Sequence, residues 1–336
     1  MLKKNNIKLY IAVSKNHTDK GGGFNFLNYL IFKLKNKKLI VNNINNSNVI
    51  LVNSHHNFIK IFFYKYLFSK KIFIHRIDGP ISKYVGKNDY RDYFVKLINS
   101  YIADATIFQS KWSFNNKNFR STNEFQIINN SADKRIYKYK KVKKIKNSII
   151  ICSWSNNINK GFKFYSFLDS KLDFKKFNVT FVGNSPIKFK NIKIHKPLNS
   201  KQLSKLMLKH QLYLTASKND PCSNSLLEAL ELRLPALVLK SGGHPEILTD
   251  KGIHFSNKKD LILKMDTLFK NYLKIFRKFK KKELDITGKY MNYFQFILNK
   301  LNNDNSTVKK INIFVLMRVI ILYLSIKIII KFKNKL

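Results

Sequence analysis

Two acidic residues on either side of an expected helix start are the residues of this sequence best placed to do chemistry. Asp220 stands eight positions before Glu228, and a Pro-Cys-Ser-Asn-Ser run lies between them. Ser, Asn and Asp cap helix starts, so we expect Asp220 in a loop and Glu228 inside the following helix. The free amides and the dipole of a helix start attract anions. Both acids can therefore face one ligand whose phosphate is held by the amides between them.

The residues that follow place this helix in an α/β unit. The pattern predicts a turn at Pro235, a buried strand over 236–239 and a second turn at Gly242 and Gly243. Glycine accepts positive φ and lets a ligand approach the backbone closely. Ligands of open α/β sheets bind at the carboxyl ends of parallel strands. We therefore expect both turns at that edge of one sheet.

This block resembles the acid-x7-acid signature of the retaining family 4 glycosyltransferases, which have the GT-B fold. The resemblance implies that Asp220 hydrogen-bonds the donor sugar and that Glu228 hydrogen-bonds the ribose of the nucleotide. It also implies that Ser223, Asn224 and Ser225 contact the sugar and the diphosphate. The family more often has Glu at the first position, and Asp reaches less far. The resemblance therefore indicates the reaction class better than the donor sugar.

Further donor-binding candidates lie in the second half of the chain. One loop resembles the family segment that carries an Arg and a Lys to the diphosphate, and Lys160 matches the Lys. The expected Arg is missing, because Trp154 and Ser155 occupy that part of the loop. Three explanations of the missing Arg stay open. Hydroxyl and amide groups replace it, Arg76 reaches across the cleft, or the reaction is slow. Gly183 ends an expected strand and is a candidate for lining the nucleotide pocket.

The first half offers its own candidates at two strand ends. A run of three glycines follows the expected first strand, and its last two, Gly22 and Gly23, can admit a phosphate or an acceptor. The run does not match G-x-G-x-x-G, so a flexible loop is an equal alternative. His75, Arg76 and Asp78 end another strand. We expect His75 or Asp78 to contact the sugar or the acceptor near the reacting centre.

Strands alternate with helices along the 336 residues, which predicts doubly wound parallel sheets in an α/β protein. With the resemblance, we expect a GT-B arrangement of two Rossmann-like domains that face a cleft. Residues 1–140 form the N-terminal acceptor-side domain and 141–300 the C-terminal nucleotide-sugar-binding domain. Whether the last helix of the second domain crosses back to the first stays open. Residues 301–336 form an apolar and basic tail.

The formal charge of +45 comes almost entirely from Lys. Nucleic-acid readers favour Arg for bidentate base contacts, and the sequence has no Arg cluster or aromatic RNA-binding motif. We therefore exclude nucleic acid as the partner and expect an anionic membrane surface instead. Two cysteines without metal-ligand spacing and the lack of an apolar opening segment favour a reducing cytoplasm. No Asp-x-Asp motif occurs, so we expect no metal and no cofactor, with the nucleotide sugar as substrate.

The tail contains a strongly apolar stretch over 311–330. Arg318 and Lys327 interrupt it, and Lys331, Lys333 and Lys335 follow. Spanning helices need about twenty residues with few charges, whereas a helix in the interface lets Lys reach the headgroups. A helix docked on the protein itself is the third alternative. We favour membrane association, with peripheral binding ahead of spanning.

Together these features predict a glycosyltransferase that moves a sugar from a nucleotide-sugar donor to a glycan or lipid-linked acceptor. The resemblance implies retention of anomeric configuration. The expected setting is cell-envelope polysaccharide or glycoconjugate synthesis, in the cytoplasm at the inner face of the membrane. The alternative is a non-catalytic GT-B protein that binds nucleotide or sugar, and a nucleotide-sugar epimerase of the same fold is the third option.

Overall fold

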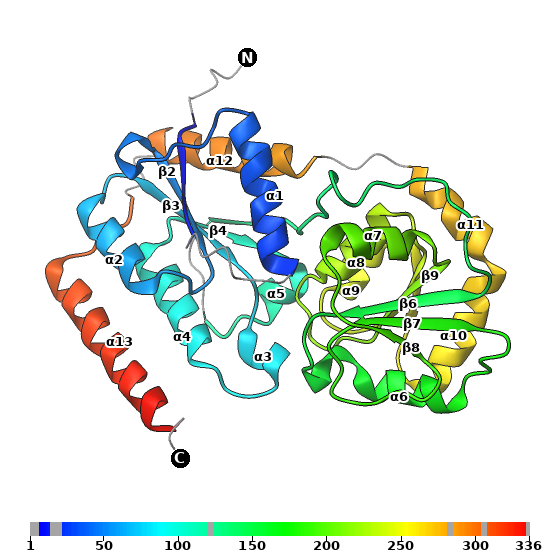
Figure 1. Cartoon of the computed structure of the whole chain (residues 1–336). Helices are drawn as coiled ribbons and strands as arrows, with labels where there is room; N and C mark the ends of the chain where they lie inside the picture. The colour runs from blue at the N-terminus through cyan, green and yellow to red at the C-terminus, as the bar shows by residue number, and fades with distance from the viewer. Residues whose placement is uncertain (1–6, 14–21, 120–123, 281–284, 304–307, 334–336) are drawn as a thin grey trace.

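The computed structural model describes residues 7–13, 22–119, 124–280, 285–303 and 308–333. Within them the chain forms two parallel β-sheets, each flanked by helices, that lie side by side (Figure 1). The predicted α/β class with two doubly wound parallel sheets is confirmed. The glycine at position 21 and Lys335 of the tail lie outside the described residues.

The first sheet has the order β1-β2-β3-β4-β5 among the described strands. These are β1 (Leu9–Ala12), β2 (Val49–Asn53), β3 (Ile72–Ile77), β4 (Ala105–Phe108) and β5 (Glu124–Ile127). Leu9 also forms a parallel bridge with Ile40 on the other edge of β1. The chain therefore leaves β1, pairs briefly on one side of it and crosses to β2 on the other. Such a reversal marks the place where open α/β sheets bind ligands.

The second sheet has the order β11-β10-β9-β6-β7-β8. Its strands are β6 (Ser148–Ser153), β7 (Asn178–Gly183), β8 (Lys193–His195), β9 (Leu212–Thr215), β10 (Ala236–Leu239) and β11 (Gly252–Phe255). The strand order reverses between β6 and β9, which are paired in parallel. The loops that follow these two strands consequently meet at one edge of the sheet.

Helices cover both faces of the two sheets. In the first half these are α1 (Gly22–Asn36), α2 (Phe58–Leu67), α3 (Ile81–Val85), α4 (Tyr90–Leu97) and α5 (Lys111–Asn115). The second half contains α6 (Phe162–Lys171), α7 (Ser200–Leu208), α8 (Asn224–Glu231), α9 (His244–Leu248), α10 (Lys258–Lys270) and α11 (Tyr272–Arg277). The described chain ends with α12 (Ile286–Asn303) and α13 (Ile313–Lys333). Strands such as β2, whose five residues are all buried, are continuous apolar runs because both sheet faces are covered.

Helix α12 belongs to the core of the first sheet although it follows the second in the chain. Its Tyr290, Phe294 and Ile297 are buried in one apolar cluster with Leu30 of α1 and Leu51 of β2. Figure 1 shows this helix beside α1, behind the first sheet. The described chain therefore passes from the first sheet to the second and returns.

The predicted C-terminal apolar helix is present as α13, and Lys327 and Lys331 stand in its last turns. It packs on the outer side of the first sheet's helices, where Leu316 and Val319 are buried with Phe58 of α2. Ile313–Phe332 is long and apolar enough to cross a membrane by length and composition alone. In the structure one face of this helix is docked on the protein.

Candidate active site at the domain interface

The loops after β6 and β9 bring Lys160 and Asp220 together. Lys160 Nζ lies 3.1 Å from Asp220 Oδ2, and both side chains are largely buried. The ring of Tyr84, from α3 of the first half, lies 4.6 Å from the same ammonium. The reversal of strand order between β6 and β9 explains this meeting of residues sixty positions apart.

Each charge of the Lys160–Asp220 pair stabilises the ionised form of its partner. Burial alone lowers the pKa of Lys160, but the Asp220 carboxylate and the Tyr84 hydroxyl raise it above its usual value. Burial raises the pKa of Asp220, but the charge of Lys160 and its hydrogen bond to the carboxylate outweigh that effect and lower the pKa. Both groups are consequently ionised at neutral pH.

The start of helix α8 lies next to this pair and is built as the sequence suggests. Ser223 caps the helix, and its hydroxyl accepts a hydrogen bond from the Leu226 amide. Ser225 turns inward, since its hydroxyl accepts one from the Tyr213 hydroxyl at 2.7 Å. Asn224 faces the first half of the molecule, where Asn130 Nδ2 donates to its Oδ1 at 3.1 Å.

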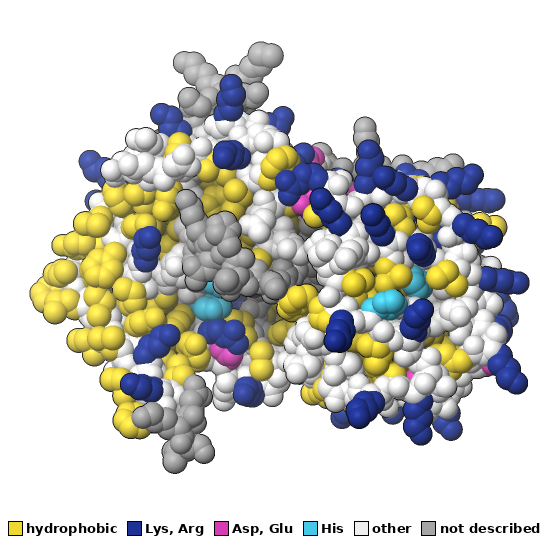
Figure 2. All heavy atoms as spheres, viewed as in Figure 1, with side chains coloured by type: hydrophobic (Ala, Val, Ile, Leu, Met, Phe, Trp, Pro, Cys, Tyr) yellow, Lys and Arg dark blue, Asp and Glu magenta, His cyan; other side chains and the backbone are white. Residues whose placement is uncertain are grey.

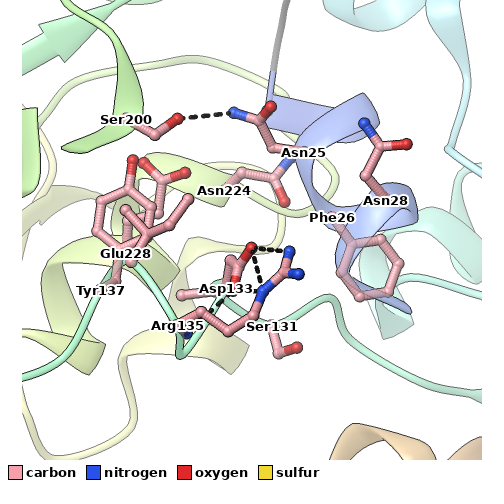
Figure 3. A pocket seen from close by; sticks show the side chains of 13 residues that line it. Asn25, Phe26, Asn28, Ser131, Asp133, Arg135, Tyr137, Ser200, Asn224 and Glu228 are labelled. Atoms are coloured by element: carbon pink, nitrogen blue, oxygen red, sulfur yellow. Dashed lines mark hydrogen bonds and ion pairs between the residues drawn. The ribbon is translucent and has the colours of Figure 1, made fainter. Parts of the chain in front are cut away.

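Beside Asn224, a pocket of about 200 Å³ opens between the two halves. Its walls come from α1, from the segment after β5, and from α7 and α8 (Figure 3). Three of the predicted site residues line it: Gly22, Asn224 and Glu228. A Cβ on Gly22 would lie 2.7 Å from the Asn224 Cβ, so only glycine permits this contact between α1 and α8.

Glu228 is a titratable group of the pocket whose pKa is strongly raised. Burial raises the pKa of its carboxyl to about 8, against a smaller lowering by a hydrogen bond from Tyr137. The side chain is nearly buried and turns toward the Tyr137 ring (Figure 3). Burial thus favours the protonated carboxyl at neutral pH, and Glu228 must release its proton before it can act as a carboxylate acceptor for ligand hydroxyl groups.

Arg135 and Tyr137 are among the residues of this pocket that sequence reasoning missed. Arg135 forms a bidentate pair with Asp133, with Nε–Oδ1 at 2.9 Å and Nη2–Oδ2 at 2.6 Å. Its guanidinium also lies 3.9 Å from the Phe32 ring of α1. Their position in the chain could have indicated them, because the segment that follows the last strand of the first sheet leads into the interface between the two halves.

The structure corrects the expectation for His75. This side chain is fully buried in β3, where its Nε2 donates to the Ser54 carbonyl at 2.9 Å and its Nδ1 faces Asn99. Burial lowers the pKa of His75 to about 4, so the ring is neutral. It lies in the sheet interior because helices cover both faces of the strand, and it does not reach the pocket.

Arg76 and Asp78 do not line the pocket either. Arg76 is enclosed by three oxygen acceptors, on Asn53 at 2.6 Å, on Asp78 at 2.5 Å and on Asn130 at 2.6 Å. It therefore does not cross the cleft to a diphosphate, and that alternative for the missing Arg is wrong. Instead it orients Asn130, which holds Asn224 at the start of α8. Asp78 is committed to Arg76 and to Gln109.

The remaining glycine candidates shape backbone contacts. Gly242 has φ +63°, and a Cβ there would lie 2.3 Å from the Asp220 carbonyl oxygen. A Cβ on Gly243 would lie 2.2 Å from the Pro221 carbonyl oxygen, and the Gly243 amide donates to Asp220 at 2.8 Å. Both glycines therefore hold the loop that carries Asp220 rather than opening space for a ligand.

Two other glycines differ from each other. Gly183 has φ +130°, and a Cβ there would lie within bonding distance of the Ser153 carbonyl oxygen, so it serves the close approach of β6 and β7. Gly23 faces open space in the first turn of α1. Only the second position leaves room for a ligand.

Contacts between the two halves hold the interface closed. The Glu246 carboxylate accepts hydrogen bonds from the Lys111 and Trp112 amides at the start of α5, each at 2.7 Å. Asn219 Nδ2 donates to the Lys83 carbonyl at 3.1 Å. The loops around Asp220 and Glu246 are thus fixed to the first half. Within the described part of the chain, no three His, Cys, Asp or Glu side chains group as metal ligands would.

Comparison with known proteins places this architecture. The structure of HepE from Anabaena in complex with UDP has 12% sequence identity, with 88% of this chain and 99% of that chain covered and a TM-score of 0.64. WaaG, a glycosyltransferase involved in lipopolysaccharide biosynthesis, has 12% identity, coverages of 85% and 99% and a TM-score of 0.61. Residues 188–283 match the family model of glycosyl transferases group 1.

The chain has the GT-B fold. This confirms the resemblance to group 1 GT-B glycosyltransferases that the sequence showed. The matched range includes α8 with Asn224 and Glu228, and the loop with Asp220. No curated protein sequence matches the chain. In this GT-B protein the pocket lies between the two sheets, against the start of α8.

Proposed function

We propose that this protein transfers a sugar from a nucleotide-sugar donor to a glycan or lipid-linked acceptor, with retention of anomeric configuration. One observation carries the proposal: the nearly buried Glu228 and the start of α8 line a pocket shared by both halves. The paired Lys160 and Asp220 lie on the neighbouring loops. HepE, which shares the fold, was crystallised with UDP and with UDP-glucose, so these are the first donors to test.

Each group has a role in this proposal. Glu228 accepts hydrogen bonds from the ribose hydroxyls, and Asp220 holds a hydroxyl of the donor sugar. Lys160 and the amides of residues 223–225 stabilise the negative charge that grows on the diphosphate as the glycosidic bond breaks. Preorganised donors of this kind lower the barrier because they need no rearrangement during the reaction. No metal and no cofactor takes part in the proposed reaction.

The proposed setting is the inner face of the cell membrane, in the synthesis of cell-envelope polysaccharide or glycoconjugate. The apolar α13 and the excess of 64 basic over 19 acidic residues support an anionic membrane surface as partner. A lipid-linked acceptor would reach the interface from that surface. Nucleic acid is not part of the proposal.

The alternative is a GT-B protein that binds a nucleotide or a sugar without transferring it. One observation favours it: the described structure has Arg76 committed to the first sheet, and Lys160 already neutralised by Asp220. Little positive charge is then left to stabilise the diphosphate as a leaving group, which favours binding over transfer.

The test is incubation of the full-length protein with a panel of nucleotide sugars, with and without candidate acceptors, in the presence of a chelator. Release of nucleotide with formation of a glycoside supports the transferase. This activity should be lost in Glu228→Ala and kept in Glu231→Ala, a control on the same helix. Binding without turnover supports the alternative, and recovery of an isomerised donor identifies an epimerase. No binding of any nucleotide sugar overturns all of them.

A further inference from the structure

Helix α13 is docked on the protein by one face and unpartnered on the other. Leu316 and Val319 are buried against the first domain, and the ring of Tyr323 lies 5.9 Å from Phe58 of α2 and 5.6 Å from Phe94 of α4. The opposite face carries exposed apolar side chains at intervals of three or four residues. These are Phe314, Met317, Ile321, Leu324, Ile328 and Phe332, called here the apolar stripe.

The apolar stripe is extended by the helix on which α13 packs. Phe63 of α2 is 42% exposed and Leu67 is 65% exposed. Figure 2 shows hydrophobic side chains gathered on the edge of the molecule where Figure 1 places α2 and α13. Contiguous apolar surfaces of this kind mark protein or membrane contacts.

Charge decides between these two kinds of partner. At 100° per residue, Arg318 flanks the apolar stripe on one side and Lys327 and Lys331 flank it on the other. The sequence from 308 to 336 contains no Asp or Glu. An apolar face between basic side chains fits a bilayer with anionic headgroups, in which Lys and Arg reach up to the phosphates. A second copy, with its own charge of +45, is repelled.

The start of α13 is fastened to the folded domain. The Lys309 amide donates to Asp104 Oδ1 at 2.7 Å, and Lys309 Nζ donates to the Ser100 carbonyl at 2.9 Å. Asp104 is itself buried against Lys65 of α2. A helix tied at its start and packed along one face can lie on a bilayer without moving, whereas spanning the bilayer requires it to detach.

We propose that α13 lies in the plane of an anionic bilayer, with the apolar stripe and the exposed end of α2 among the acyl chains. The first domain is then held against the membrane in one fixed orientation. The inference takes the membrane setting from the proposed function. Lipid binding is measured without any donor, so the two proposals can fail separately.

The first experiment measures sedimentation of the full-length protein with phosphatidylcholine vesicles, with and without phosphatidylglycerol. Ile321→Asp with Ile328→Asp should lower the bound fraction by about tenfold or more, because two apolar side chains of the stripe are then missing from the bilayer contact. The matched control is Leu263→Asp with Leu273→Asp, at side chains of the second domain that are 64% and 65% exposed. It should leave binding unchanged, and both double variants should keep donor binding.

The second experiment reports the depth of the helix. An environment-sensitive dye is attached to Phe314→Cys, Ile321→Cys or Ile328→Cys, with the unsubstituted chain as the labelling control. Lipid-borne quenchers should reach all three positions at the same shallow depth. Deepest burial at Ile321 would show a spanning helix and overturn the proposal. So would vesicle binding that survives the double stripe substitution, or a protein that self-associates through the stripe and ignores lipid.

Discussion

At the scale of single residues, Glu228 is the group whose protonation should control donor binding. Its raised pKa of about 8 means that the empty pocket holds mainly a protonated carboxyl at neutral pH. Ribose hydroxyls need the carboxylate as acceptor, so binding should release a proton. This links donor affinity to pH in a direction that can be measured.

We expect the affinity for the donor found in the panel to rise with pH and to level off above about pH 8. Well below the pKa the change should approach about tenfold per pH unit, because each bound ligand displaces one proton. Isothermal titration calorimetry between about pH 6 and about pH 9 measures the donor affinity at each pH. Glu228→Gln should bind more weakly at high pH and show a flat profile; a wild-type profile that is already flat would contradict the assignment.

The same residue affects stability with a defined sign. Its folded-state pKa lies above the unfolded value of 4.5, so its favourable contribution is complete below about pH 4.5 and is lost as pH rises through about 8. The free energy of unfolding of Glu228→Gln should therefore fall less than that of the wild type between these pH values. Urea unfolding at several pH values measures the difference, and parallel curves for the two proteins would refute it.

Lys160 offers a second prediction at this scale. Lys160→Met removes the ammonium beside the expected diphosphate and should lower kcat by about 10²-fold, as loss of a preorganised electrostatic group does. Lys163→Met, on the exposed side of α6, is the matched control and should keep the wild-type rate. A loss confined to KM would place Lys160 in ground-state binding only.

The residue scale also shows the limits of sequence reasoning. The cap at Ser223 was predictable because capping depends on local residue types. The burial of His75 was not, because it depends on which strands and helices surround β3. The contact of Glu228 with Tyr137 joins segments from different elements, and no spacing along the chain reports it.

At the scale of elements, one buried ion pair links α2, β3 and the start of the tail. Lys65 Nζ lies 2.9 Å from Asp104 Oδ2, which also accepts the Phe73 amide, while Asp104 Oδ1 accepts the Lys309 amide. Burial lowers the pKa of Lys65, although the Asp104 charge opposes this. Removing the carboxylate therefore leaves a buried ammonium without its counter-ion.

Asp104→Ala should lower the free energy of unfolding of the first domain by about 3–5 kcal/mol, the usual result of breaking a buried pair from one side. Asp285→Ala is the matched control, because its pair with Lys33 is partly exposed, at 3.3 Å, and should cost about 0–1 kcal/mol. Urea denaturation followed by circular dichroism distinguishes them. Equal effects would show that the buried pair adds nothing beyond an exposed one.

The elements themselves were largely predictable. The apolar run over 236–239 predicted β10, and the alternation of strands with helices predicted the parallel sheets. The pairing at Ile40 that reverses the first sheet is a single bridge, too short to leave a pattern. The exposed and docked faces of α13 were not separable either, since both faces are apolar and only contact with α2 distinguishes them.

At the scale of the whole molecule, closure of the interface depends on a few backbone contacts. Glu246→Ala removes the acceptor of two amides of α5 and should open the cleft on average. The radius of gyration from small-angle scattering should rise, and KM should increase more than kcat falls. Asp250→Ala, at a surface carboxylate 3.8 Å from Lys278, is the control and should change neither. An unchanged scattering curve for Glu246→Ala would show that other contacts suffice.

The return of α12 to the first sheet has a consequence for biosynthesis. Tyr290 and Phe294 complete a core that Leu30 and Leu51 begin more than two hundred residues earlier. A nascent chain leaving the ribosome therefore cannot finish its leading domain until its trailing helix has emerged, so the domain encoded second should acquire protease resistance first.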